Sequence, residues 1–187
     1  EALLRWKEDT GHETSIEKTI QLIEKNNLIK PLTNWIFVTV CQYIQVLNID
    51  GLVIGVNLSM IDLHDKKLPK RIAGYLKQYD TKPSQIVIEI TEGQIMQKPD
   101  DVIEILSKLA LMGLSLSIDD FGTGQASLTY LKKLPVEKLK IDQSFVRDIE
   151  TDRNDKLIVK ATIELAHRLG LRVIAEGVET AGCYELL

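Results

Sequence analysis

LSLSIDDFGTGQASLTYL, residues 114–131, joins an apolar run to two adjacent carboxylates and then to a turn that contains two glycines. The apolar run is typical of a buried strand, the glycines permit a tight turn, and residues 127–133 are expected to form a helical return. Asp119 and Asp120 therefore fall at the end of a buried strand, where an ionised side chain loses hydration unless a partner replaces the water. A cation is the obvious partner, although adjacent aspartates are also common in solvated turns and helix N-caps.

The composition limits the classes of protein to which the chain can belong. It has 187 residues, of which 44% are hydrophobic, and a formal net charge of -4, which suits one soluble domain with a substantial core. The chain contains no block of lysines and arginines, so we expect no nucleic-acid polymer as a partner. The composition still permits a small anionic substrate that is bound through a metal ion. Cys41 and Cys183 lie far apart, which favours buried thiols in a reducing compartment over a disulfide or a zinc site.

The expected location is the cytoplasm, either as a free protein or as the cytoplasmic part of a membrane-anchored one. No apolar run approaches the ~20 residues that a bilayer span needs. The chain opens on EALLRW and ends on the helical pattern CYELL. We therefore expect it to be a segment of a longer protein.

Strand-like and helical segments alternate along the whole chain. Alternation at this pitch indicates parallel βαβ units, arranged in either an open doubly wound sheet or a closed (β/α) barrel. Thr14 and Glu17 form a predicted capping box for the first helix, which extends to about Leu28. The expected strands are 1–6, 52–59, 85–92, 114–120, 138–142 and 172–179, and the other expected helices are 32–47, 63–79, 99–112 and 154–169.

Polar residues near the strand ends favour the barrel. An open sheet gathers its ligand groups at one switch point, whereas a closed ring brings the ends of many strands to one place. The polar residues come from successive expected strands and are Glu1, Asn57, Glu89, Asp119, Lys140 and Glu176. The sequence therefore predicts an α/β fold of the TIM-like (β/α)8 barrel type.

These residue types point to metal-assisted chemistry at phosphorus. Glu1, Asn57, Glu89 and Asp119 supply oxygen ligands without histidine or cysteine, a set that selects Mg²⁺ or Mn²⁺. Strand alternation places Asp119 and Asp120 on opposite sides, so Asp120 is assigned to a second ion together with Glu176. Two neighbouring ions are the usual apparatus for in-line displacement at phosphorus, and Lys140 would orient the water or take up developing charge.

Six motifs then resemble those of the EAL domain family of cyclic-di-GMP phosphodiesterases, in order and spacing. They are EALLR (1–5), VNLS (56–59), EITE (89–92), DDFGTG (119–124), LKID (139–142) and AEGVET (175–180). The resemblance covers residues 1–187 and implies one partial EAL domain. It implies a modified (β/α)8 barrel, incomplete at both ends of this segment, that hydrolyses cyclic-di-GMP to linear 5′-pGpG with two Mg²⁺ or Mn²⁺ ions in bacterial signalling.

The resemblance also implies residue roles. First-metal ligands would be Glu1, Asn57, Glu89 and Asp119; second-metal ligands would be Asp120 and Glu176; the catalytic residues would be Lys140 and Glu176; the substrate side would hold Arg5, Asp142 and Glu179; and Glu92 would anchor the DDFGTG loop. The bidentate fork of Arg5 suits a phosphate.

The chain departs from the family pattern in the loop after DDFGTG. Gln125 and Ala126 stand where the family commonly has Tyr-Ser, which affects the packing of the loop and any homodimer contact made through it. The family's first strand, its last strand and helix, and its Gln-Gly-Tyr segment are expected outside these residues. Sensory or GGDEF-type domains are expected there as well.

Two other interpretations remain. A catalytically silent cyclic-di-GMP receptor or protein-interaction module would be expected to have lost some of the acidic residues, and none is lost. An unrelated metal-dependent barrel enzyme, such as an enolase-type lyase, also places carboxylates at strand ends, but it does not predict the EALLR opening or the DDFGTG loop.

Overall fold

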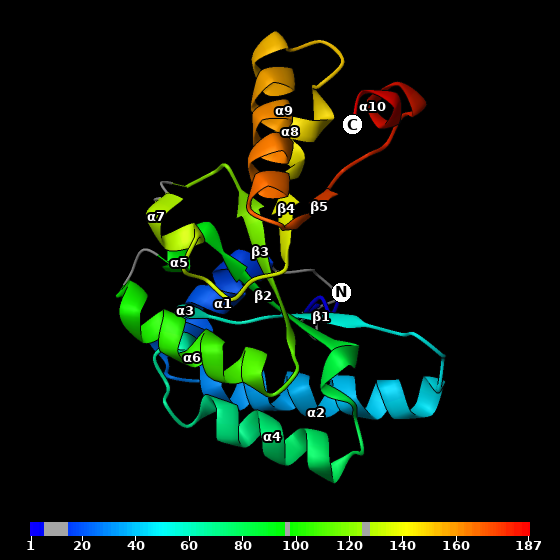
Figure 1. The fold of residues 1–187 in the computed structure, drawn as a ribbon. Helices are drawn as coiled ribbons and strands as arrows, with labels where there is room; N and C mark the ends of the chain where they lie inside the picture. Colours follow the sequence, from blue (N-terminus) through cyan, green and yellow to red (C-terminus); the bar gives the residue numbers. More distant parts are fainter. Residues whose placement is uncertain (6–14, 96–97, 125–127) are drawn as a thin grey trace.

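Five parallel strands, each next to its neighbour in sequence, form the sheet of the computed structural model (Figure 1), which describes residues 1–5, 15–95, 98–124 and 128–187. Their carboxyl ends therefore lie along one edge of the sheet. The strands are β1 Ile54–Asn57, β2 Ile86–Thr91, β3 Ser115–Phe121, β4 Lys138–Ile141 and β5 Arg172–Ala175. This order and direction confirm the predicted α/β class.

Helices cover the sheet and extend beyond it. Those of the first half are α1 Ile16–Lys25, α2 Ile29–Leu47, α3 Met60–Leu63, α4 Leu68–Gln78, the 3₁₀ turn η1 Pro83–Gln85, α5 Glu92–Ile95 and α6 Pro99–Leu111. The others are α7 Leu128–Leu131, α8 Gln143–Arg147, α9 Arg153–Arg168 and α10 Ala181–Leu186.

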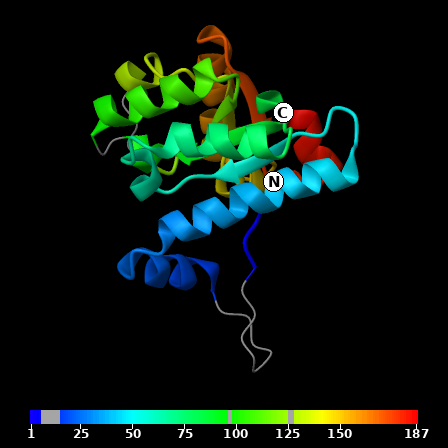
Figure 2. The ribbon, with the colours of Figure 1, turned by 90° about the horizontal axis from the view of Figure 1, so that it is seen from below.

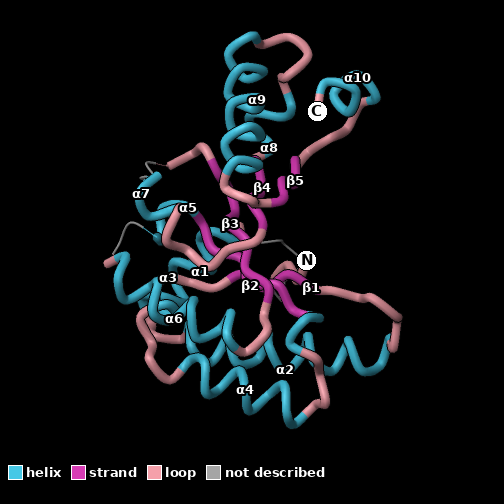
Figure 3. Tube along the Cα trace, in the orientation of Figure 1, coloured by secondary structure: helices cyan, strands magenta, loops and turns pink. Residues whose placement is uncertain are grey.

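The long helices α2, α4 and α6 lie together on one side of the sheet (Figures 1 and 3), with α2 between α1 and α4 (Figure 2). At the other end of the sheet, α8 and α9 pack against each other, and α9 also contacts β4 and β5. No helix in the described part of the chain is long and apolar enough to cross a bilayer.

The core is continuous from the helices into the sheet. In β2 the first five residues are buried, as expected for a strand covered on both faces. Phe37 of α2 and Leu106 and Leu109 of α6 are fully buried in the same cluster. Cys41 and Cys183 are buried free thiols, which confirms that expectation.

The predicted segments differ from the observed ones mainly at their ends. Residues 1–5 do not form the predicted strand, because a single backbone bond, from Ala2 N–H to the Gly55 carbonyl at 2.9 Å, joins them to β1. The predicted helix 63–79 is divided between α3 and α4. Thr14 of the predicted capping box lies outside the described residues.

The buried face of α9 is only partly the predicted one. The spacing of apolar residues in this helix predicts an inward face of Leu157, Ile158, Ala161, Leu165 and Leu169. Leu165 and Leu169 do pack against the core, but Leu157 is 57% exposed and Ile158 is 39% exposed. Val159, Thr162 and Ala166 are buried instead. The main contacts of α9 are with α8, β4 and β5, and these neighbours decide which side of the helix is buried.

Asp62 fixes the turn that follows β1. Its buried Oδ2 accepts hydrogen bonds from the hydroxyls of Thr33 and Ser59, each at 2.8 Å, and from the Ser59 backbone N–H at 3.2 Å. The Ser59 hydroxyl in turn accepts from the Asp62 N–H, which completes a capping box for α3. Burial raises the pKa of Asp62, and these hydrogen bonds oppose that rise.

Replacing Asp62 should destabilise the fold. In Asp62→Ala the buried hydroxyl of Thr33 and the half-buried hydroxyl of Ser59 lose their acceptor and α3 loses part of its capping box, so we expect the free energy of unfolding to fall by about 2 kcal/mol in urea titrations. The matched control is Asp50→Ala, an exposed aspartate, which should change it by less than about 0.5 kcal/mol. Equal effects of the two substitutions would contradict this role.

Candidate metal centre

The predicted site residues come from different strands and meet at the carboxyl edge of the sheet. Asn57 ends β1, Glu89 lies in β2, Asp119 in β3 and Lys140 in β4. Glu176 follows β5 and is held by a backbone bond from its N–H to the Ile141 carbonyl at 3.1 Å. Although we expected a closed ring to be necessary, the sheet in the described residues is open and still brings these groups together.

Lys140 lies at the centre of the group. Its Nζ is 2.7 Å from Glu176 Oε1 and 3.0 Å from Asp119 Oδ1, and it is 3.6 Å from both Glu1 Oε2 and Glu89 Oε1. The lysine is buried, so it reaches these carboxylates without bulk water between them. Burial acts to lower the pKa of Lys140, but its hydrogen bonds to Glu176 and Asp119 raise it above the ordinary value.

The carboxylates form two overlapping sets that can hold cations. In one set, oxygens of Glu1, Glu89 and Asp119 lie within 4.8 Å of one another, and in the other, oxygens of Asp119, Asp120 and Glu176 do so. The Asn57 amide donates to Glu1 Oε1 at 2.7 Å, which places its side chain beside the first set. Carboxylate and amide oxygens suit Mg²⁺ or Mn²⁺.

One buried oxygen in the first set has no hydrogen-bond partner in the described structure. Glu89 is 7% exposed, and its Oε2 accepts no hydrogen bond. A buried ionised oxygen without a partner is costly, and a metal ion would supply the missing interaction. The residues present therefore fit a divalent cation.

Asp119 and Asp120 reach the same centre, which corrects the prediction that they point to opposite sides. The ladder between β3 and β4 shifts register after Ile118, and Asp120 has a φ of 52°, in the left-handed region. Asp120 donates its backbone N–H to Asp119 Oδ1 at 3.0 Å. Because the strand is irregular here, the period of two that underlay the prediction no longer applies.

Glu92 contacts the turn after Asp120. Its buried Oε2 accepts backbone hydrogen bonds from Gly122 at 2.9 Å and from Gly124 at 3.3 Å. The turn requires glycines, since Gly122 has a φ of 104° and a Cβ on Gly124 would lie 3.0 Å from Glu92 Oε1. Gln125 and Ala126, the departures from the family pattern, lie outside the described residues.

Two acidic groups of the centre, Glu89 and Asp120, have pKa values above those of isolated carboxyls. Burial, with the charges of Glu1 and Asp119, raises the pKa of Glu89 to about 7, although Lys140 opposes the rise. Burial, with the charges of Asp119, Asp142 and Glu176, raises the pKa of Asp120 to about 6. These shifts show that one lysine does not offset the crowding of negative charge.

The residues predicted for the substrate side, Arg5, Asp142 and Glu179, are more dispersed than the carboxylates around Lys140. The Asp142 carboxylate accepts from the Ser144 N–H at 2.9 Å and caps α8, and its hydrogen bonds from Ser144 lower its pKa against the effect of burial. Arg5 is exposed and donates to the Leu4 carbonyl at 3.1 Å. Glu179 is exposed on the segment after β5.

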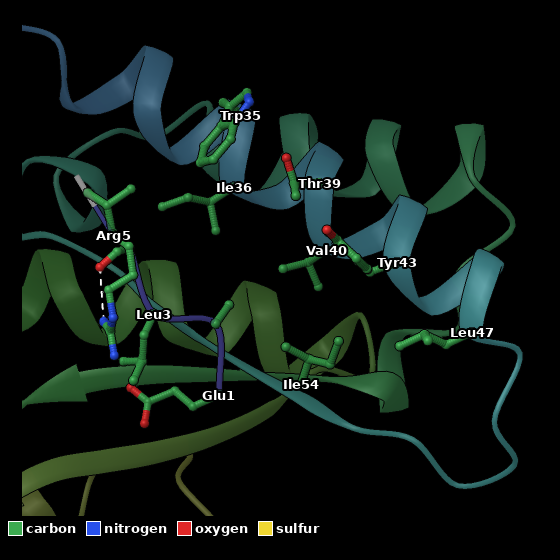
Figure 4. A pocket seen from close by; sticks show the side chains of 12 residues that line it. Glu1, Leu3, Arg5, Trp35, Ile36, Thr39, Val40, Tyr43, Leu47 and Ile54 are labelled. Carbon is green, nitrogen blue, oxygen red and sulfur yellow. Dashed lines mark hydrogen bonds between the residues drawn. The ribbon is translucent and has the colours of Figure 1, made fainter. Parts of the chain in front are cut away.

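A largely apolar hollow of about 320 Å³ lies beside Glu1 and Arg5 (Figure 4). Side chains of α2 form its opposite wall, among them Trp35 and Tyr43, which are 58% and 59% exposed. The motifs of the sequence do not include these two aromatic residues. The signal that could have identified them is that both lie on the exposed side of a helix whose other side is buried.

The chain is similar to known proteins in both sequence and fold. The sequence model of the EAL domain family matches residues 1–187 of this chain. The bifunctional diguanylate cyclase/cyclic di-GMP phosphodiesterase MucR of Pseudomonas aeruginosa is 37% identical over 191 residues, which cover 100% of this chain and 28% of MucR. The cyclic di-GMP phosphodiesterase NbdA of the same species is 38% identical over 183 residues, which cover 96% of this chain and 23% of NbdA.

A solved structure of the PaMucR phosphodiesterase in a c-di-GMP complex has 36% identity and a TM-score of 0.92, and the match covers 99% of this chain and 76% of that one. This likeness confirms the predicted family resemblance and the TIM-like barrel type of the fold. The chain spans about a quarter of the length of the two curated relatives.

The raised pKa of Glu89 predicts how the stability of the metal-free protein depends on pH. The folded state binds this proton more tightly than the unfolded state, so the stabilisation is complete below the ordinary pKa of 4.5 and is lost as the pH rises through about 7. The free energy of unfolding in EDTA should fall by about 2 kcal/mol between pH 5 and pH 8. Glu89→Gln should remove the share of Glu89 and leave the smaller share of Asp120, whose pKa is raised to about 6, and an unchanged slope in that variant would contradict the assignment.

Removing the Glu92 carboxylate should weaken metal binding without removing a ligand. If Glu92 holds the turn, Glu92→Ala leaves Asp120 less preorganised, so the Mn²⁺ concentration for half-saturation should rise about tenfold in calorimetric titrations. Glu92→Gln should fall between this variant and the original protein, since a neutral acceptor binds the two N–H groups less strongly.

The exposed Glu164 provides the control for this measurement, because Glu164→Ala removes the same charge far from the turn. Superimposable Mn²⁺ curves for Glu92→Ala and the original protein would mean that Glu92 does not position the site.

Proposed function

The chain belongs to the EAL domain family, and we propose that it is a metal-dependent phosphodiesterase that hydrolyses cyclic-di-GMP to linear 5′-pGpG. The observation that supports this most directly is the position of Lys140 among four carboxylates at the ends of parallel strands. The names of MucR and NbdA, which are cyclic di-GMP phosphodiesterases, support the substrate.

Two divalent ions, Mg²⁺ or Mn²⁺, would be held by the strand-end oxygens. Glu1, Asn57, Glu89 and Asp119 would hold the first ion, and Asp120 and Glu176 would hold the second together with the shared Asp119. When bound, such ions lower the pKa of a water and offset the charge of the phosphate oxygens.

The chain's own side chains would orient the reactants. The Lys140 ammonium would donate a hydrogen bond to the attacking water or to a phosphate oxygen. Glu176, 2.7 Å from that ammonium, is placed to accept a proton from the water. We place Arg5 on a phosphate oxygen through its guanidinium, with Asp142 and Glu179 in supporting positions on the substrate side.

The proposed reaction is balanced without a further reactant. The water oxygen forms a bond to phosphorus while the bond from phosphorus to one 3′ oxygen breaks. The proton lost by the water passes to Glu176 and is returned through solvent to the 3′ oxygen as it leaves, so that Glu176 ends the reaction unchanged. The product keeps one phosphodiester and gains a 5′-phosphate, which is 5′-pGpG.

We also propose that residues 1–187 form part of a single EAL domain in a cytoplasmic signalling protein. The length of the curated relatives supports further domains, of a sensory or GGDEF type, outside this segment. A homodimer is proposed on the family resemblance, with the loop after DDFGTG as its contact.

An assay of the reaction tests the proposal. Incubation with cyclic-di-GMP and Mg²⁺ or Mn²⁺ should yield linear 5′-pGpG, resolved by ion-pair chromatography, and EDTA should stop its formation. Lys140→Ala should lower the rate at saturating substrate by about a hundredfold and leave substrate affinity nearly unchanged, because the lysine acts on groups whose charge develops in the transition state. Binding of cyclic-di-GMP without any linear product would instead identify a receptor.

A further inference from the structure

Gly55 lies in β1 directly against the carboxylate of Glu89. A Cβ built on Gly55 would lie 2.7 Å from Glu89 Oε1, 2.8 Å from the carboxyl carbon and 2.9 Å from Oε2. All three distances are shorter than a Cβ atom tolerates. The carboxylate therefore occupies the space that any other residue at position 55 would fill.

Space, and not backbone conformation, is what requires glycine at this position. The glycines with a positive φ are Gly51, Gly113, Gly122, Gly170 and Gly177, and Gly55 is not among them. It pairs with Val87 in a regular part of the parallel ladder, where an alanine would normally be accommodated. Glycine in a strand weakens it and often marks a close approach by another group.

The position of the Glu89 carboxylate in this space determines what its two oxygens contact. Oε1 is 3.6 Å from Lys140 Nζ, and an oxygen of Glu89 lies within 4.8 Å of oxygens of Glu1 and Asp119. Oε2 is buried and accepts no hydrogen bond in the described structure. The carboxylate is thus held between the sheet and the centre with one oxygen still available.

We propose that Gly55 is a positioning residue, which sets the location of Glu89 for divalent-metal binding. Because Gly55 has no Cβ, the Glu89 carboxylate can occupy the space next to β1. The role rests on the proposed two-metal function. Any side chain at position 55 displaces the carboxylate from the set that it forms with Glu1 and Asp119. Gly55 itself would touch neither metal nor substrate.

The contact can be tested without any metal. In EDTA, Gly55→Ala should lower the urea midpoint of unfolding, because the new methyl group collides with the Glu89 carboxylate. In a Glu89→Ala background the same substitution should raise the midpoint, since the collision is absent and alanine forms strands better than glycine. A fall of equal size in both backgrounds would show that Gly55 does not act through Glu89 and would overturn the proposal.

The consequence for metal is tested by Mn²⁺ calorimetry on the folded variants. Gly55→Ala should raise the Mn²⁺ dissociation constant about tenfold, as substitutions behind metal ligands commonly do. Glu89→Asp retracts the carboxylate by one methylene, so adding it to Gly55→Ala should recover part of the affinity. The control is Gly74→Ala in α4, where a Cβ meets nothing within 4 Å and the dissociation constant should not change.

These results separate the inference from the proposed function. If Gly55→Ala binds Mn²⁺ as tightly as the original protein, the positioning role is wrong whether or not cyclic-di-GMP is hydrolysed. If the stability and affinity changes occur as expected in a protein that releases no 5′-pGpG, the positioning role stands and the phosphodiesterase assignment fails.

Discussion

The arrangement of the site depends on the ion pairs of Lys140. Its buried ammonium group lies among carboxylates from four other segments of the chain. Removing a lysine from water is unfavourable unless opposite charges replace the lost hydration. Here Glu176 and Asp119 do so at hydrogen-bonding distance, and Glu1 and Glu89 at 3.6 Å. The lysine in turn reduces the repulsion between these acids, although it does not remove it.

The excess negative charge distinguishes this group of side chains from an ion-pair network in which the charges are matched. The raised pKa values of Glu89 and Asp120 show that the folded chain gives these carboxylates less favourable surroundings than water does. Ionisable residues whose burial lowers the stability of the folded state are typical of functional sites, and the packing of the rest of the fold offsets the lost free energy. The buried strand β2 and the helices packed on it provide that support.

Backbone irregularity contributes as much to the site as the regular strands do. The register shift after Ile118 and the left-handed φ of Asp120 bring two adjacent aspartates to one centre. Glu92 then receives hydrogen bonds from the following turn, and Gly55 leaves room for Glu89. The positions of the clustered carboxylates are therefore determined by neighbouring groups outside the cluster.

The sequence by itself determined the α/β class, the strand-end location of the polar residues and the family resemblance. These follow from composition, from local periodicity and from the order of the motifs, none of which needs the chain to be folded. Only the tertiary structure decided the distances between side chains of different strands, the shared side of Asp119 and Asp120, the exposed face of α9 and the fit of Gly55 against Glu89. Such features depend on sheet curvature, register and packing between distant segments, and a local pattern contains no information about which residue from another strand will occupy the neighbouring space.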